Sequence, residues 1–121
     1  MSGLGWEMKK GVLVVTPPDY LDFEFKEAIQ DLIDDQQTGN QHKILLVMKE
    51  VDLMNSHGAS ALLTLINHVK SKEGYIAFSN LSNPIIEDTF RDIGILWYFE
   101  TDEHILRCKD VDGAIDQLGD D

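Results

Sequence analysis

The residue types best suited to chemistry lie together at Asn55-Ser56-His57-Gly58, immediately before the apolar segment 59–69. Asn55 and Ser56 are both types that cap helices, and the apolar residues that follow recur at helical spacing. This pattern predicts a helix that begins at the tetrapeptide. The start of a helix has unpaired backbone N–H groups and a positive dipole end, so it suits an anion. The candidate site therefore combines a hydroxyl, an imidazole and a helix start.

The other reactive residue types form no pattern typical of catalysis or metal binding. The four histidines lack metal-ligand spacing, and the single cysteine, Cys108, allows neither an intramolecular disulfide nor a four-cysteine zinc site. Asp52 follows a predicted strand, but we interpret it as a turn residue because the other acidic and basic residues of a receiver domain are not in place. The sequence has no glycine-rich phosphate loop and no nucleophile elbow. We therefore expect a protein that is not an enzyme and that has no cofactor and no metal.

The charge of the chain restricts its partners. The 121 residues include 22 acidic and 10 basic ones, which gives a formal net charge of −12. Such a chain repels nucleic acid and anionic membranes and suits basic or mixed-charge partners. Acids are concentrated in residues 19–35 and 100–121, whereas residues 36–99 are nearly balanced. The N-terminus has no signal-peptide pattern and no apolar run approaches the ~20 residues that cross a membrane, so we expect a cytoplasmic protein without membrane insertion.

Hydrophobic periodicity predicts the elements that position the helix start. The predicted strands are residues 7–10, 11–16, 43–48, 75–78 and 105–108. The predicted helices are residues 25–33, a helix from Asn55 or Ser56 to Val69, residues 84–93 and residues 111–118. This alternation predicts an α/β fold with a small mixed, mostly parallel sheet of four to five strands and about four helices.

The chain is expected to be a single domain over residues 1–121. Residues 1–10 are expected to be a partly flexible N-terminus, and residues 119–121 a tail. Residues 95–104 contain the aromatic cluster Trp97-Tyr98-Phe99 and read as an insertion before the last strand, with a conformation that the pattern leaves open. The aromatic cluster suits either a core-covering segment or an interface anchor.

Residues 43–63 resemble the signature of the STAS family, the anti-sigma factor antagonist domains. In that family a buried strand leads to a Val-Asp-Phe-like tripeptide, which is matched here by Val51-Asp52-Leu53. An Asp-Ser-Ser-Gly-Leu-Gly helix start and an Ala-Leu-Leu run follow, and residues 55–60 and 61–63 are similar to them. Gly74 with residues 75–80, residues 82–94 and residues 112–115 resemble later family features. The resemblance covers residues 11–118 and implies the STAS fold.

The resemblance also implies where the family's regulated phosphoserine lies. That residue is the second serine of the pair, and this sequence has His57 there. Ser56 is the remaining serine, so it is a candidate phosphoacceptor or simply a helix cap. His57 is an exposed polar residue, a pH-sensitive contact or a phosphohistidine. Asn55, Ser56, His57, Gly58 and Ser60 are the predicted partner-binding residues, and Ser60 also suits close packing.

The family's mechanism is partner switching, in which the unmodified domain binds an anti-sigma factor or a related kinase-type regulatory protein and the phosphorylated form releases it. His57 replaces the family's phosphoserine, Asn55 its usual aspartate, and Ala59-Ser60 its Leu-Gly pair. These departures favour a diverged bacterial regulator that works without the usual phosphoserine switch. One alternative is an accessory subunit of a membrane transporter complex. Another is a small enzyme or ligand-binding protein that uses the helix start as an anion site. The oligomeric state stays open.

Overall fold

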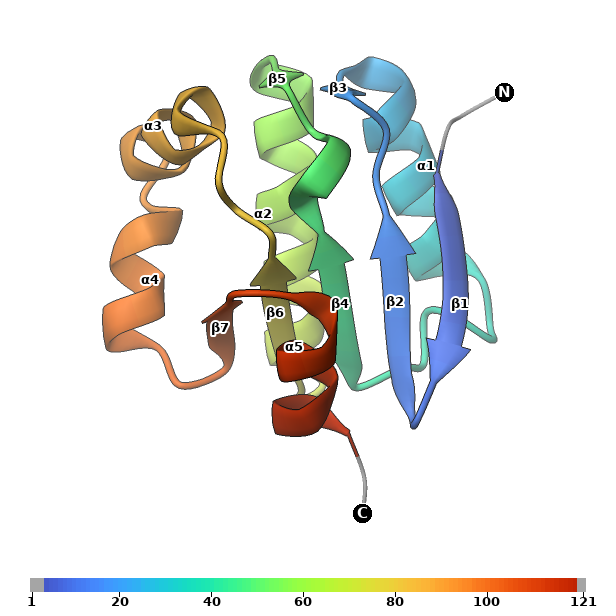
Figure 1. Ribbon diagram of the computed structural model, residues 1–121. Helices are drawn as coiled ribbons and strands as arrows, with labels where there is room; N and C mark the ends of the chain where they lie inside the picture. The colour runs from blue at the N-terminus through green and yellow to red at the C-terminus, as the bar shows by residue number, and fades with distance from the viewer. Residues whose placement is uncertain (1–3, 120–121) are drawn as a thin grey trace.

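Runs of β-branched and large apolar residues form the inner strands of a central sheet in the computed structural model, which describes residues 4–119 (Figure 1). In chain order, the strands of the whole structure are β1 (Gly5–Lys9), β2 (Val12–Thr16), β3 (Tyr20–Leu21), β4 (Lys43–Val47), β5 (Leu53–Met54), β6 (Tyr75–Ser79) and β7 (Ile105–Cys108). The helices are α1 (Phe23–Asp34), the 3-10 helix η1 (Met48–Glu50), α2 (Ser56–Ser71), α3 (Pro84–Asp92), α4 (Ile95–Thr101) and α5 (Val111–Leu118). Among residues 4–119, no helix is both long enough and apolar enough to cross a membrane.

The main sheet has five strands in the order β1-β2-β4-β6-β7. β1 and β2 are antiparallel and joined by a two-residue turn at Lys10-Gly11, where both residues have positive φ. All the other neighbouring strands are parallel. These pairings confirm the predicted α/β fold with a mixed, mostly parallel sheet. β3 and β5 form a separate two-stranded parallel sheet at the top of Figure 1.

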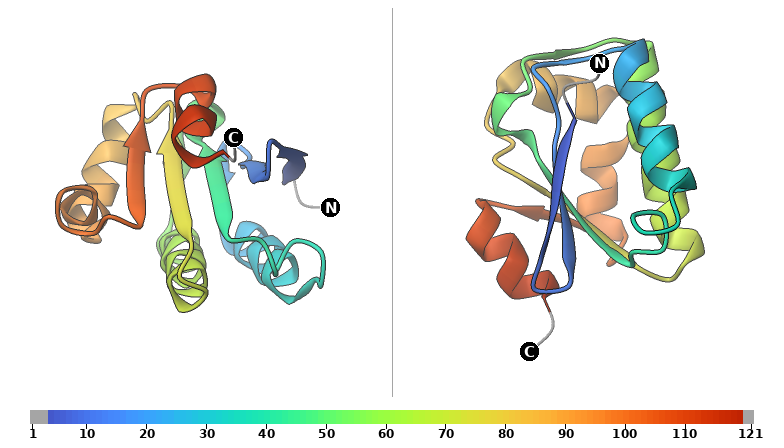
Figure 2. Two further views of the ribbon diagram at one scale, coloured as in Figure 1. Left: turned by 90° about the horizontal axis from the view of Figure 1, so that it is seen from below. Right: turned by 90° about the vertical axis from the view of Figure 1, so that its right-hand side faces the viewer.

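Successive residues of the inner strands point to opposite faces of the sheet and form two cores. One face packs against α1, α2, α3 and α4, and its buried strand residues include Leu13, Val15, Ile44, Leu46, Ile76 and Phe78. The other face packs against α5, and its buried residues include Val12, Val14, Leu45, Val47 and Ala77. Figure 2 shows α1 and α2 on one side of the sheet and α5 on the other. The burial of both faces explains why the inner strands are continuously apolar.

The main addition to the predicted fold is α4, which makes five α-helices in the described residues rather than about four. Gly94 has a φ of 89° and joins the end of α3 to the start of α4. Ile95 is fully buried, and Tyr98 and Phe99 pack against the same core. Trp97 faces away from that core with 63% of its surface exposed. The aromatic cluster is therefore an ordered helix that covers the core with one side.

The ends of the chain differ slightly from the predicted boundaries. β1 begins at Gly5, two residues before the predicted partner strand, and pairs along its whole length with β2. Residues 1–3 and 120–121, which belong to the predicted flexible N-terminus and tail, lie outside the described residues. The domain limits of 1 and 121 stay a prediction.

Candidate functional site

The start of α2 is fixed by Asn55, which is the N-cap residue of the helix. Its side-chain oxygen accepts hydrogen bonds from the backbone N–H groups of His57 at 2.9 Å and Gly58 at 3.1 Å. Its own backbone N–H donates to the carbonyl of Leu21 at 3.1 Å, and its amide donates to the Tyr20 hydroxyl at 3.4 Å. Asn55 therefore both begins α2 and attaches it to β3.

Gly58 allows α2 to lie directly against β3. This glycine is buried, and a Cβ atom added to it would meet the carbonyl oxygen of Leu21 and lie 2.7 Å from the Leu21 Cβ atom. No side chain fits at that distance, so the position requires glycine. Gly58 therefore fixes the distance between α2 and β3, and as a buried residue it adds little to the exposed surface of the site.

Ser56 and His57 are the first two residues of α2, and both are exposed. Asn55 takes the cap position, so Ser56 is the first residue of α2 and not its N-cap. The imidazole of His57 packs edge-to-face on Phe23, with 5.3 Å between the ring centroids and an angle of 78° between the planes. Ser60 is partly buried one turn further along α2. Of the five predicted partner-binding residues, Ser56 and His57 are thus the most accessible.

Three large apolar residues that the sequence analysis missed surround this helix start. Tyr20, Phe23 and Leu53 are 45%, 52% and 51% exposed. Tyr20 and Leu53 are paired residues of β3 and β5, Tyr20 contacts Asn55, and Phe23 contacts His57. We refer to Tyr20, Phe23, Leu53, Ser56 and His57 as the docking patch. A group of exposed apolar and aromatic side chains is typical of a protein interface.

The docking patch has acidic residues on one side. The backbone N–H groups of Asp52 and Leu53 donate to the carbonyl of Asp19 at 2.8 and 3.2 Å, which places two carboxylates beside β3 and β5. Asp22 caps α1 by accepting from the N–H groups of Glu24 and Phe25. The acidic block at residues 19–35 therefore begins at the docking patch and continues along α1. Part of the second acidic block belongs to α5, on the opposite face of the sheet (Figure 2).

The perturbed ionisable groups lie elsewhere. The side chain of Lys70 and the backbone N–H of His104 hydrogen-bond Asp102 and hold the pKa of its carboxyl below its usual value. Burial raises the pKa of the Cys108 thiol, with a smaller contribution from the charge of Asp110. Within residues 4–119, no group of three or more His, Cys, Asp or Glu side chains is arranged to hold a metal ion. The docking patch itself consists of exposed apolar and aromatic side chains together with the hydroxyl of Ser56 and the imidazole of His57.

The fold and the start of α2 together define a class of protein. Its members are small α/β domains in which a helix begins with a capping residue and a glycine and packs there against a short strand. The chain belongs to the STAS family, since the sequence model of the STAS domain matches residues 6–107. This finding confirms the resemblance seen in residues 43–63.

Solved structures share the fold at low sequence identity. A candidate anti-sigma factor antagonist from Thermotoga maritima is 16% identical with a TM-score of 0.77, and the match covers 95% of this chain and 93% of that one. The phosphorylated form of SpoIIAA from Bacillus is 18% identical with a TM-score of 0.72, over 96% and 99% of the two chains. A sulfate transporter family protein from Wolinella succinogenes is 16% identical with a TM-score of 0.70, over 93% and 88%. No curated protein sequence is significantly similar to this chain.

Proposed function

We propose that this STAS protein regulates another protein by binding it through the docking patch and that it does not act as an enzyme. The observation that carries the proposal is the exposure of Tyr20, Phe23 and Leu53 around the start of α2. Aromatic and large apolar side chains contribute most of the binding energy in protein interfaces when they are surrounded by polar residues. Here Ser56, His57 and the nearby carboxylates provide the polar surroundings.

The proposed partner is an anti-sigma factor or a related kinase-type regulatory protein. Two of the similar structures are forms of SpoIIAA, and one of these is described as an anti-sigma factor antagonist. Their similarity to this chain supports the same class of partner. The neutral, partly apolar patch beside an acidic α1 suits a partner surface with an apolar centre and basic residues on one side.

Phosphorylation of Ser56 would act directly on this patch. A phosphate adds about −1.5 to −2 charges at neutral pH. The positive end of α2 tolerates that charge, so the helix would remain folded. A docked partner would nevertheless have to desolvate the phosphate next to Phe23 and Leu53, which weakens binding. His57 stands where the family has its phosphoserine, and it contacts Phe23. We therefore propose that the docking patch binds its partner without any phosphorylation at position 57.

A second candidate function is an accessory role in a membrane transporter complex. The similar structures include a sulfate transporter family protein and the murine anion transporter Slc26a9. The latter is 22% identical with a TM-score of 0.61, and the match covers only 18% of that chain. In that case the docking patch would bind a transporter subunit. Genes for a transporter beside the gene for this chain would favour this function over regulation of a sigma factor.

The test is affinity capture from the native cell with matched variants. Phe23→Ser combined with Leu53→Ser removes two apolar side chains of the docking patch, and Trp97→Ser removes the 63% exposed indole on α4 as a control. The expected result is that the double variant loses the partner while the Trp97 variant retains it. The reverse pattern would refute the docking patch as the interface.

Phosphorylation is tested separately with the captured kinase, ATP and mass spectrometry. Phosphate on Ser56 that is lost in Ser56→Ala supports a switch at that residue. Phosphate on His57 would overturn the choice of Ser56. If neither residue is modified while capture still depends on Phe23 and Leu53, the protein is a constitutive binder.

A further inference from the structure

β1 is an edge strand with an accessible flank. It is at one end of the strand order and pairs only with β2 among the strands that the structure describes. All five of its residues are exposed, and the large side chains of Trp6 and Met8 are 43% and 39% exposed. An edge strand has a row of backbone N–H and C=O groups that can pair with another chain. No proline interrupts β1, so its outer flank suits the addition of a strand.

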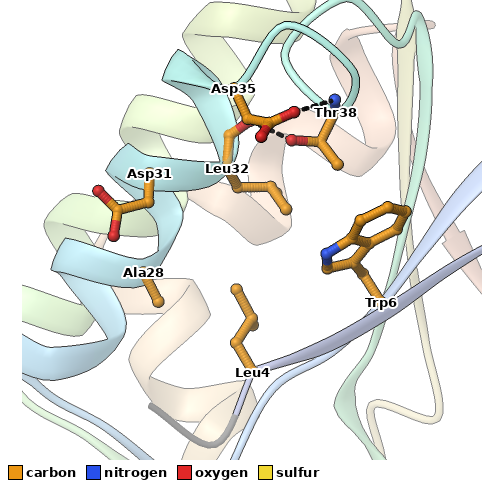
Figure 3. Close-up of a pocket in the computed structure, with 7 residues that line it drawn as sticks. All are labelled: Leu4, Trp6, Ala28, Asp31, Leu32, Asp35 and Thr38. Carbon is orange, nitrogen blue, oxygen red and sulfur yellow. Dashed lines mark hydrogen bonds between the residues drawn. The ribbon is translucent and has the colours of Figure 1, made fainter. Parts of the chain in front are cut away.

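A cavity of about 240 Å³ lies between β1 and α1 (Figure 3). Leu4 and Trp6 line it from the β1 side, and Ala28, Asp31, Leu32 and Asp35 line it from α1 and the residue that follows. The Trp6 side chain extends from β1 toward the loop at Thr38 (Figure 3). The cavity is smaller than the ~300–1,000 Å³ typical of sites for drug-sized ligands. Its size therefore suits a single long side chain.

Of the two carboxylates that line the cavity, that of Asp35 is held by local hydrogen bonds. One oxygen of Asp35 accepts hydrogen bonds from the backbone N–H groups of Gln37 at 2.8 Å and Thr38 at 3.2 Å, which fixes its position at the end of α1. Asp31 lies one turn earlier and is exposed. Residues 19–35 contain seven acids and one base, Lys26, so the surface beside the cavity is strongly acidic. An aromatic face next to carboxylates is a favourable environment for a cation.

We propose that β1 and this cavity bind an extended basic segment of a partner protein. The segment pairs with the outer flank of β1 as an additional strand, and one of its lysine or arginine side chains enters the cavity. That side chain packs on the indole of Trp6 and forms ion pairs with Asp31 and Asp35. Strand addition supplies affinity through backbone hydrogen bonds, and the cavity selects the basic side chain.

Charge favours a basic segment at this edge over a second copy of the chain or a nucleic acid. A second copy of the chain would bring the same acidic α1 and a net charge of −12 to the same edge, so it is disfavoured. Nucleic acid and other anions are repelled by the same carboxylates. The two carboxylates of the cavity, Asp31 and Asp35, lie roughly 12–18 Å along α1 from Phe23, given a rise of about 1.5 Å per residue. The proposal is therefore independent of the docking patch and of the function proposed for it.

The test uses the full chain and a fluorescein-labelled peptide of alternating lysine and valine residues, with the glutamate and valine counterpart as the comparison. Fluorescence anisotropy gives the Kd. The measurement is made at about 150 mM salt because charges far from the cavity are largely screened there. Trp6→Ala and Asp31→Asn are each expected to raise the Kd about five- to tenfold. Asp116→Asn removes the same charge from an exposed position on α5, on the other face of the sheet, and is expected to change the Kd by less than about twofold.

Amide shift mapping by NMR locates the peptide. The expected perturbations fall on residues 5–9 and 28–38. Equal effects of Asp31→Asn and Asp116→Asn, equal binding of the acidic peptide, or perturbations confined to the start of α2 would each overturn the proposal. So would a concentration-dependent dimer that Trp6→Ala abolishes in sedimentation experiments, since it would assign the edge to a second copy. If Trp6→Ala does not fold, the Kd of Asp31→Asn compared with that of Asp116→Asn still tests the proposal.

Discussion

Replacing Gly58 with alanine is expected to destabilise the domain, although alanine is the better helix former. Gly58 is the third residue of α2, and an added Cβ atom would meet the carbonyl oxygen and Cβ atom of Leu21. Leu21 is fully buried, and its carbonyl accepts the N–H of Asn55. These atoms cannot turn aside as the tip of a flexible side chain can. Either β3 or the first turn of α2 must move to accept the methyl group.

The magnitude is the difference between two opposing contributions. Alanine in place of glycine stabilises a helix by at most about 1 kcal/mol. Overpacking a well-filled site costs about 1–3 kcal/mol, and contact with backbone atoms places this site at the upper end. The expected net loss in the free energy of unfolding is about 1–2 kcal/mol. For a domain of this length that corresponds to a fall in Tm of about 3–10 °C.

Gly113 provides a matched control because it is also the third residue of its helix, α5. The N–H groups of both glycines donate to the capping side chain, at 3.1 Å for Gly58 and 2.8 Å for Gly113. A Cβ atom on Gly113 would meet only the carboxylate oxygen of Asp110, at 3.1 Å. Because that side chain can adjust, Gly113→Ala is expected to be neutral or to stabilise by up to about 0.5 kcal/mol.

Urea unfolding followed by circular dichroism measures both variants, and an unchanged m-value shows that the change lies in stability. The reasoning is refuted if Gly58→Ala is as stable as the parent chain or more stable. It is also refuted if Gly113→Ala loses as much as Gly58→Ala. Either outcome would show that the contact with β3 is not what requires glycine at position 58.

Three further predictions test other parts of the structure. Asn55→Ala removes two accepted cap bonds and should cost about 1–2 kcal/mol in urea unfolding, whereas Asn83→Ala removes one and should cost about 0.5–1 kcal/mol. The hydrogen bond from Lys70 lowers the pKa of Asp102, so this carboxylate stabilises the fold above its unfolded pKa and loses that contribution as pH falls through the lower folded pKa. Asp102→Asn should therefore make the urea midpoint less dependent on pH below about 5, and an unchanged dependence would contradict this. Cys108 is 6% exposed and burial raises the pKa of its thiol, so a disulfide reagent should label it only as the chain unfolds, and rapid labelling of the native protein would count against its burial.

The elements that the sequence predicts best are those that bury a continuous set of apolar residues. β4 buries four of its five residues, and α2 buries seven residues at helical spacing. The sequence leaves the conformation of residues 95–104 open because α4 has only seven residues and follows Gly94, which on sequence grounds ends a helix. The conformation of α4 depends on tertiary contact, since Ile95 is buried in the same core as residues of α3 and β7. Local propensity carries little information about such a segment.

The candidate site was predicted only in part for a similar reason. The cap residue and glycine that begin α2 carry local signals, so Asn55 and Gly58 could be found from their types and spacing. Tyr20 and Leu53 reach the same surface through a pairing between two-residue strands that are more than 30 positions apart, held by the carbonyl of Asp19. Strands this short have no periodicity to detect. The apolar half of the docking patch is therefore visible only once the chain is folded.

The position of the acids beside the docking patch gives the proposed interaction a particular kinetic character. The acidic block begins at Asp19, next to the patch, and continues along α1, while Tyr20, Phe23 and Leu53 are uncharged. Charges at the margin of an interface mainly accelerate association, whereas buried apolar contacts mainly slow dissociation. For a partner with basic residues facing α1, rising salt should therefore lower the association rate and leave the dissociation rate nearly unchanged. Loss of Phe23 should instead raise the dissociation rate and leave the association rate nearly unchanged, because it removes contact area and leaves the electrostatic attraction in place.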